Sequence, residues 1–304
     1  MKINRIRDVR PESPDTPVTL KISGNIFEVR YMASTHAVPI QKLDREHGLD
    51  LRTGEVIDFK HHASRAEDIA SVAQSLKRLR DLINANLADP DTALWVTLTY
   101  RENMTDATRL YEDYRRFWQR FCYYLRKSQQ PKAEYIAAAE PQGRGAWHLH
   151  CLLLFPCKAP FLPNAEIAAI WRHGFTKTKR LRGIDNPGLY LTAYLGDMDL
   201  LEAIRFGVTG GAIREANVID EQGVQRKKAI VKGARLRLYP PGFNLYRSSR
   251  GVQHPLVFKT TEGEAQALIG EATLTYEKTV SITDESGDIK NIISYRQYSR
   301  NRKE

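Results

Sequence analysis

Three side chains in one short stretch of the sequence have the chemistry of metal ligands. The segment WHLHCLLLF, residues 147–155, reads as a buried strand, yet it carries His148 and His150 on either side of one leucine. Residues two apart on a strand point to the same side, so the two imidazoles can converge on one point. Imidazole suits divalent transition metals, and carboxylate oxygen suits Mg²⁺ or Mn²⁺. The pair therefore predicts a cation site if an acidic group lies beside it.

Glu140 is placed to supply that acidic group. It ends the apolar segment YIAAAE, and the PQGRG turn that follows returns the chain beside it. An unpaired buried carboxylate costs several kcal/mol, and a cation shared with the two imidazoles removes that cost. A set of two histidines and one carboxylate leaves positions open for a substrate, which is typical of a catalytic site. Two alternatives stay open: the histidines are satisfied core residues, and Glu140 pairs with Arg144.

The elements that must position these side chains indicate an α+β fold, an antiparallel sheet with helices packed on it. Apolar residues recur with helical spacing after a capping box of Ser64 and Glu67, and they alternate in the strand-like segments. The predicted helices cover residues 64–87, 105–127, about 164–172 and about 187–205, and the predicted strands cover 91–100, 135–140 and 147–155.

Composition divides the chain into three expected parts. Residues 1–90 form an N-terminal extension that includes the helix at 64–87 and a hairpin turning at Gly24-Asn25. Residues 91–206 form the core with the histidines. Residues 207–304 are rich in Gly, Pro and basic residues and end in a hairpin, TLTYEKTVSIT–DESGD–IKNIISY. We expect this last part to be an accessory DNA-binding region.

The charge of the chain favours a nucleic-acid partner. The net charge is +10 and the pI about 9.4, and basic residues cluster at 177–182, 226–237, 246–250 and 296–303. Such clusters are typical of proteins that bind a phosphate backbone, although a solvated surface gives the same pattern. No apolar run approaches the roughly 18 residues of a membrane span, and the N-terminus has no signal-peptide pattern. We therefore expect an intracellular protein without a membrane partner.

Two tyrosines follow in the helix that begins near Pro187. Tyr190 and Tyr194 stand four residues apart, so their hydroxyls lie on one helical face. Such a pair is common at the rim of a core. The order of the features, a VTLT strand, a Glu followed by His-x-His, then a helix with tyrosine, favours a shared site.

In this order the motifs resemble those of the HUH (histidine–hydrophobic–histidine) endonucleases that initiate rolling-circle replication. The similarity is to replication-associated proteins of filamentous and other small phages and related plasmids. It rests on LWVTLTY (94–100), EPQGRGAWHLH (140–150), IWRHGFT (170–176) and YLTAY (190–194). It covers about a third of the chain, and KGARLRLYPPGFNLYRSSRG (232–251) is similar to a weaker block downstream.

The resemblance implies an RRM-like core that nicks and joins single-stranded origin DNA. Tyr190 would form a 5′-phosphotyrosine and release a 3′-hydroxyl, Tyr194 would be a second nucleophile, and Mg²⁺ or Mn²⁺ would be the cofactor. The expected partners are a host DNA polymerase and a host helicase in a bacterial cytoplasm. The helicase is expected because the chain has no Walker motif. Residues expected to contact DNA are Arg144, Lys177, Lys179, Arg180, Arg182, Tyr246 and Arg247, with Tyr239 and Phe243 as further stacking candidates.

The chain departs from the family's pattern at one position. Ala193 stands where the family usually has lysine, and Asp197 occupies its next lysine position. This departure favours an alternative, a non-catalytic or weakly active DNA-binding protein. A relaxase or transposase of the same superfamily shares the chemistry, and a metal-dependent RNA or cyclic-phosphate hydrolase would leave no covalent adduct with DNA.

Overall fold

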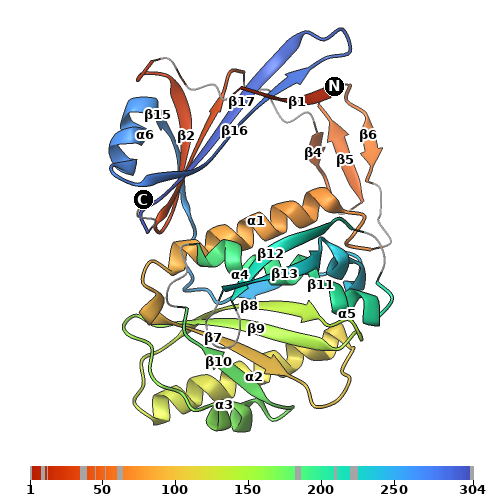
Figure 1. The fold of residues 1–304 in the computed structure, drawn as a ribbon, viewed down its shortest axis with the longest axis vertical. Coiled ribbons are helices and arrows are strands. Elements are labelled where there is room, and N and C mark those ends of the chain that lie inside the picture. Colours follow the sequence, from red (N-terminus) through yellow and green to blue (C-terminus); the bar gives the residue numbers. More distant parts are fainter. Residues whose placement is uncertain are drawn as a thin grey trace. The chain divides into compact units, whose positions relative to one another are not determined.

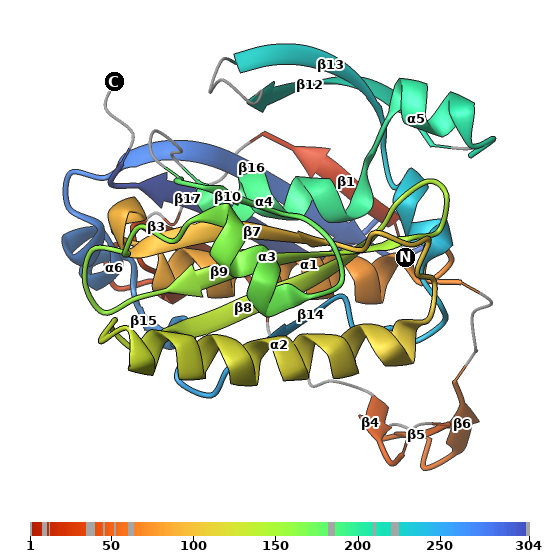
Figure 2. The ribbon, with the colours of Figure 1, turned by 90° about the horizontal axis from the view of Figure 1, so that it is seen from below.

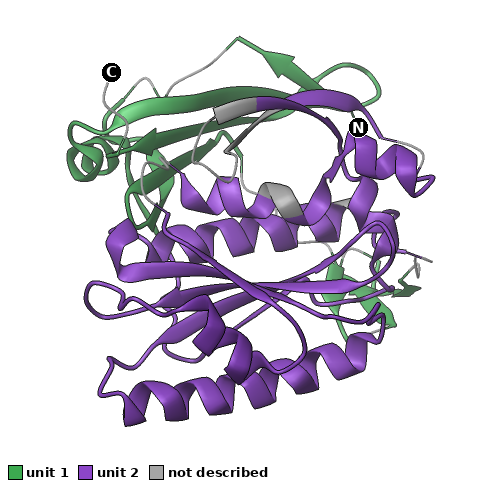
Figure 3. Cartoon of the chain, turned by 60° about the horizontal axis from the view of Figure 1, so that its bottom comes forward, with its two compact units in different colours: residues 1–62, 256–304 green, residues 63–255 purple. Residues whose placement is uncertain are grey.

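The two ends of the chain form one compact unit, and the middle of the chain forms another. Residues 1–62 and 256–304 form unit 1, and residues 63–255 form unit 2 (Figure 3). The predicted boundaries at 90/91 and 206/207 do not coincide with these limits. The computed structural model describes residues 2–7, 11, 13–34, 40–44, 46–51, 53–59, 64–181, 186–208, 211–219 and 225–301, except the side chains of 69, 193, 194, 216–219, 225 and 226.

Unit 2 is built around a five-stranded antiparallel sheet. Its strand order is β10 (Thr176–Lys179), β7 (Ala93–Thr99), β9 (Trp147–Leu154), β8 (Glu134–Pro141) and β14 (Tyr246–Ser248). The hairpin of β8 and β9 was expected from the sequence, and it places Glu140 opposite His148 and Ala138 opposite His150. The mixed α+β fold with antiparallel sheets is thereby confirmed.

Successive side chains along each strand of this sheet point to opposite faces, and the two faces pack against different helices. On one face, Leu149 and Cys151 join a core with the apolar side of α2 (Ala107–Lys127) and with α3 (Asn164–Trp171). On the other face, Leu152 and Leu154 pack with α1 (Ile69–Asn86) and α4 (Pro187–Gly196). The sheet therefore lies between two helical layers (Figure 1). The odd–even alternation of β9 places both histidines on the α1 and α4 face.

The predicted start of α1 was wrong. No capping box forms between Ser64 and Glu67; the helix begins at Ile69, and the Asp68 side chain accepts from the Ser71 N–H at 3.2 Å. Arg65 reaches Asp68 at 3.2 Å and is buried beside it. A carboxylate one turn later than expected satisfies the free Ser71 N–H, so residues 64–67 form a turn instead.

The helix predicted over 187–205 is two helices. After α4 the chain forms the short strand β11 (Met198–Asp199) and then α5 (Leu200–Arg205). The Asp197 side chain accepts from the Gly233 N–H at 2.9 Å, and the Asp199 side chain caps α5. Both carboxylates bind backbone N–H groups, which ends one helix and begins the next.

Unit 2 also contains the short 3₁₀ helix η1 (Pro90–Thr92), which precedes β7, and, in its described part, three further elements between α5 and β14. Strands β12 (Ile213–Ile219) and β13 (Gln225–Val231) form a three-stranded sheet with β11, and β13 contacts α5 (Figure 2). The 3₁₀ helix η2 (Ala234–Leu238) then returns the chain to the edge of the main sheet.

Unit 1 contains a six-stranded sheet made from both ends of the chain. Its order is β1 (Lys2–Ile6), β16 (Thr273–Thr283), β17 (Ile289–Ser299), β3 (Ile26–Met32), β2 (Pro17–Ser23) and β15 (Leu256–Thr261). Helix α6 (Glu262–Ile269) packs on it, and β4 (Ile40–Lys42), β5 (His47–Asp50) and β6 (Val56–Asp58) form a separate sheet. Both predicted hairpins are confirmed, and Gly24 has the positive φ of 58° that the first turn requires.

Candidate active site

Glu140, His148 and His150 lie on one face of unit 2, as the strand alternation predicted. Glu140 and His148 are direct partners on neighbouring strands, and the His150 Nε2 is hydrogen-bonded to the Glu140 carboxylate. The two imidazole rings are 6.5 Å apart, centre to centre. The structure therefore brings the three predicted ligands together.

A buried arginine holds the other oxygen of Glu140. The Arg235 guanidinium lies 3.0 Å from Glu140 Oε1 and 3.0 Å from Glu202 Oε2, and it also donates to the Pro141 carbonyl. Burial raises the pKa of Glu140, but His150, Arg235 and His148 together outweigh it and lower the pKa to about 2. Glu140 is therefore a carboxylate at neutral pH. Its predicted alternative partner, Arg144, is exposed and donates to Gln142 instead.

His148 has an unsatisfied nitrogen. Within the described part of the chain, its buried Nε2 has no hydrogen-bond partner. Burial lowers the pKa of His148 to about 4, against the opposing effect of Glu140, so the ring is neutral at pH 7. A buried polar atom without a partner is costly, and a neutral imidazole nitrogen is a ready metal ligand.

His150 is held on both sides. Its Nδ1 lies 3.2 Å from the Thr97 hydroxyl on β7, and its ring stacks on Trp95 at 5.2 Å between centres. Thr97 is the direct cross-strand partner of His150. The strand that resembles the family's first motif thus fixes the orientation of one predicted ligand.

Tyr190 lies on the same face of the sheet. It is half-buried and packs against the apolar cluster that includes Leu152 of β9 and Leu191 of α4. Helix α4 approaches α1 closely because Gly188 has no side chain: a Cβ there would overlap the Arg80 carbonyl oxygen. The Gly188 N–H also donates to Asn84 Oδ1 at 2.8 Å.

The donor set fits a cation, although its side chains are not arranged as ligands. No group of three His, Cys, Asp or Glu side chains among the described residues has an arrangement that could hold a metal. Glu140 and His150 instead bond directly to each other. Two imidazoles, one of which carries the orphaned His148 Nε2, and one ionised carboxylate are nonetheless the donors that a catalytic divalent site uses.

Two residues expected to contact DNA lie in one row across this face. Lys177 of β10 is opposite Thr97, which is opposite His150; His150 is opposite Ala138, which is opposite Tyr246 of β14. Residues directly opposite each other in an antiparallel sheet share a face. The row therefore connects two predicted contacts, one at each edge of the sheet, through the site.

The other expected contacts lie outside this row. Lys179 of β10 is opposite Trp95 of β7 and lies on the same face as Lys177, whereas Arg180 donates to the carbonyls of Ala159 and Asp91. Arg247 is opposite Ala137 and faces α2. Arg182 and the Tyr194 side chain lie outside the described residues.

The stacking role expected for Tyr239 and Phe243 was wrong. Both are buried, and Tyr239 donates to the Ala139 and Leu195 carbonyls. An aromatic ring in a basic, proline-rich segment looks exposed in sequence, but here the segment covers the edge of the core.

The part of the chain that carries this site matches one known family. Residues 93–199 match the family model for replication-associated protein ORF2. The match covers about a third of the chain and includes Glu140, His148, His150 and Tyr190. It confirms the resemblance to replication-associated proteins over this range. No curated protein and no solved structure matches the chain.

Two members of the site were missed from the sequence. Arg235 and Glu202 lie outside the matched range, in η2 and α5. Arg235 belongs to a run of basic residues that looked like a DNA-binding surface, and only its burial distinguishes it.

In the described part of the chain, no helix is both long enough and apolar enough to cross a membrane.

Proposed function

We propose that unit 2 nicks and rejoins single-stranded DNA to initiate rolling-circle replication, with Tyr190 as nucleophile and a divalent cation held by Glu140, His148 and His150. The observation that carries the proposal is the position of these three donors. They meet on one face of β8 and β9, and Tyr190 packs on that same face. The match to a replication-associated family over residues 93–199 supports the biological setting.

The reaction is a transesterification. The Tyr190 phenol oxygen bonds to phosphorus and loses its proton, while the bond from phosphorus to the 3′ oxygen breaks and that oxygen gains a proton. The products are a 5′-phosphotyrosine and a 3′-hydroxyl that primes a polymerase. When bound, Mg²⁺ or Mn²⁺ supplies positive charge that stabilises the phosphate in the transition state. The covalent bond conserves the energy of the phosphodiester, so rejoining needs no ATP.

The residues around the three donors control the protonation and the position of these side chains. His150 and Arg235 lower the pKa of Glu140, and Arg235 fixes one of its oxygens. Burial keeps His148 neutral, so that its Nε2 lone pair is available. A phenol has an ordinary pKa near 10 and needs help to lose its proton. Lys177 and Tyr246 lie in the row of His150 and would contact the strand on either side of the site.

The setting follows from this chemistry. The substrate is single-stranded origin DNA, and the 3′-hydroxyl requires a host polymerase. A host helicase would unwind the duplex in a bacterial cytoplasm. Tyr194, four residues after Tyr190 in α4, would be a second nucleophile.

A covalent-adduct assay tests the proposal. A labelled random library of single-stranded DNA would be incubated with the full chain and Mn²⁺ and then run on a denaturing gel. We expect an adduct in the wild type and in Tyr194→Phe, and none in Tyr190→Phe, since phenylalanine keeps the packing but has no hydroxyl. An undiminished adduct in Tyr190→Phe would reject the assignment of the nucleophile.

One observation favours a second candidate, a DNA-binding protein that does not nick. Both oxygens of Glu140 already have a partner without a cation, since Arg235 pairs with one and His150 is hydrogen-bonded to the other. Ala193 also replaces the family's usual lysine. Calorimetric titration with Mn²⁺ separates the two candidates. The nuclease binds Mn²⁺ and loses that binding in His148→Gln, whereas the second candidate binds DNA but shows no Mn²⁺ binding that depends on His148.

A further inference from the structure

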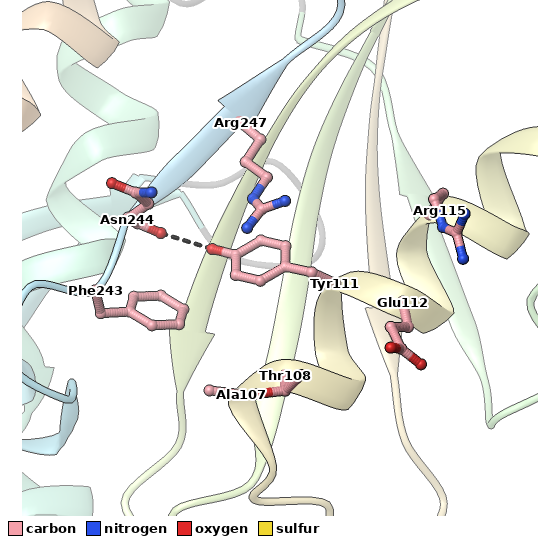
Figure 4. Close-up of a pocket in the computed structure, with 8 residues that line it drawn as sticks. All are labelled: Ala107, Thr108, Tyr111, Glu112, Arg115, Phe243, Asn244 and Arg247. Carbon is pink, nitrogen blue, oxygen red and sulfur yellow. Dashed lines mark hydrogen bonds between the residues drawn. The ribbon is translucent and has the colours of Figure 1, made fainter.

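A cavity of about 530 Å³ lies on the α2 face of the five-stranded sheet, opposite to the face with Glu140. Its lining comes from the first turns of α2 and from the segment that leads into β14 (Figure 4). The lining residues are Ala107, Thr108, Tyr111, Glu112, Arg115, Phe243, Asn244 and Arg247. The volume is in the range of sites for small ligands.

A stacked arginine forms one wall of this cavity. The Arg247 guanidinium lies 3.6 Å from the centre of the Tyr111 ring, close enough for a cation–π contact. The Tyr111 hydroxyl donates to the Asn244 carbonyl at 2.6 Å, and the ring also stacks on Phe243. The guanidinium therefore rests on a ring that is itself fixed. Figure 4 shows Arg247 and Phe243 on different sides of Tyr111.

The cavity also holds charge that the protein does not neutralise. Arg115, Arg247 and Glu112 are exposed, and none of the three takes part in an ion pair with another described residue. Two arginines against one carboxylate leave an excess of positive charge. Guanidinium groups bind phosphate, and the flat face of a guanidinium stacks on nucleobases.

We infer that this cavity binds one nucleotide of a single-stranded DNA that extends beyond the nicking site. The base stacks on the open face of the Arg247 guanidinium, and the adjoining phosphate pairs with Arg115. Glu112 accepts a hydrogen bond from an exocyclic amino group of the base. The inference rests on the proposed function for the identity of the strand, and it adds a second contact on the far side of the sheet from the histidines.

The test measures DNA binding without nicking. Tyr190→Phe protein in EDTA is titrated into a fluorescent 30-nucleotide single-stranded DNA of mixed sequence, and anisotropy gives Kd (the length is roughly twice the site size of about 16 nucleotides for one large binding fold). We expect Arg247→Gln to weaken binding by about tenfold, because one stacked base is lost. Arg247→Lys would recover only part of this loss, since lysine keeps the charge but cannot stack.

A matched control lies on the same helix. Arg126 also sits over a tyrosine ring, that of Tyr123 at 5.5 Å, but it lines no part of this cavity. Arg126→Gln should leave Kd unchanged. If Arg247→Gln lowers the melting temperature, Arg115→Gln carries the test instead, and it should reduce the dependence of log Kd on log salt concentration by about one unit.

The outcomes separate this inference from the proposed function. Equal Kd values for Arg247→Gln and Arg126→Gln in folded proteins would overturn the inference, whether or not the wild type forms an adduct. A loss of binding in Arg247→Gln without any wild-type adduct would keep the DNA site and reject the nuclease.

Discussion

At the scale of single residues, Arg235 positions the Glu140 carboxylate and pairs with its charge. It is buried, contacts two carboxylates and holds the pKa of Glu140 low together with the histidines. Taking one partner out of a buried ion pair leaves an uncompensated charge, which is far more costly than the net contribution of the pair. Arg235 therefore stabilises the fold and positions the carboxylate.

We expect Arg235→Gln to lower the free energy of unfolding of unit 2 by about 3–5 kcal/mol, because Glu140 and Glu202 lose their common cation. Tryptophan fluorescence during urea unfolding measures this, since all four tryptophans, Trp95, Trp118, Trp147 and Trp171, belong to unit 2. Arg144→Gln is the control, with an expected change within about 0.5 kcal/mol. Equal stability of the two variants would contradict the role of Arg235.

At the scale of elements, the position of α4 depends on one small residue. Gly188 lets α4 lie against α1, and its N–H is bound by Asn84. The sequence predicted a helix with two tyrosines here, but nothing in the helical spacing indicated which neighbour it would pack on. The close contact places Tyr190 over the sheet.

Gly188→Ala should destabilise unit 2 by about 1–3 kcal/mol, because the added methyl overlaps the Arg80 carbonyl and forces α4 away from α1. The same shift should reduce adduct formation at equal concentrations of folded protein. Gly196→Ala is the matched change in the same helix, since among the described atoms its Cβ would meet the Leu76 Cδ1 at an ordinary contact distance of 3.8 Å. A variant pair with the same stability and the same adduct yield would show that α4 does not need this contact.

At the scale of the whole molecule, unit 2 buries several phenols. Burial raises the pKa of Tyr100, Tyr114 and Tyr239, and it raises that of Tyr111 to about 12 despite the nearby Arg247. These tyrosines line the core between the sheet and α2 or cover its edge. The folded state therefore keeps phenol protons that the unfolded chain, with an ordinary pKa near 10, releases.

The sign of the pH dependence follows. Above about pH 10 the unfolded chain binds fewer protons than the folded chain, so the free energy of unfolding falls as pH rises. Urea unfolding at increasing pH should show this loss, and phenolate absorbance should show a second group of tyrosines that ionises later than the first. A single transition of all 14 tyrosines near pH 10 in the folded protein would contradict the burial.

Sequence alone determined the parts of this protein that depend on local pattern. Period-two and helical spacing predicted β7, β8, β9 and α2, and the alternation along β9 placed His148 and His150 on one face. These predictions succeeded because each depends on neighbours within one strand, helix or hairpin. The end of α4 was missed because Asp197 accepts from Gly233, a partner far along the chain.

Only the tertiary structure decided which distant segments meet. It paired the two ends of the chain in one sheet, through β3 with β17 and β2 with β15, and it placed Arg235 on Glu140. It also buried Tyr239 and left Arg247 at a cavity, although both belong to one basic stretch. In the sequence, one strand or arginine cannot be distinguished from another by its chemistry. Burial and packing against specific partners in the folded chain give each of them a different role.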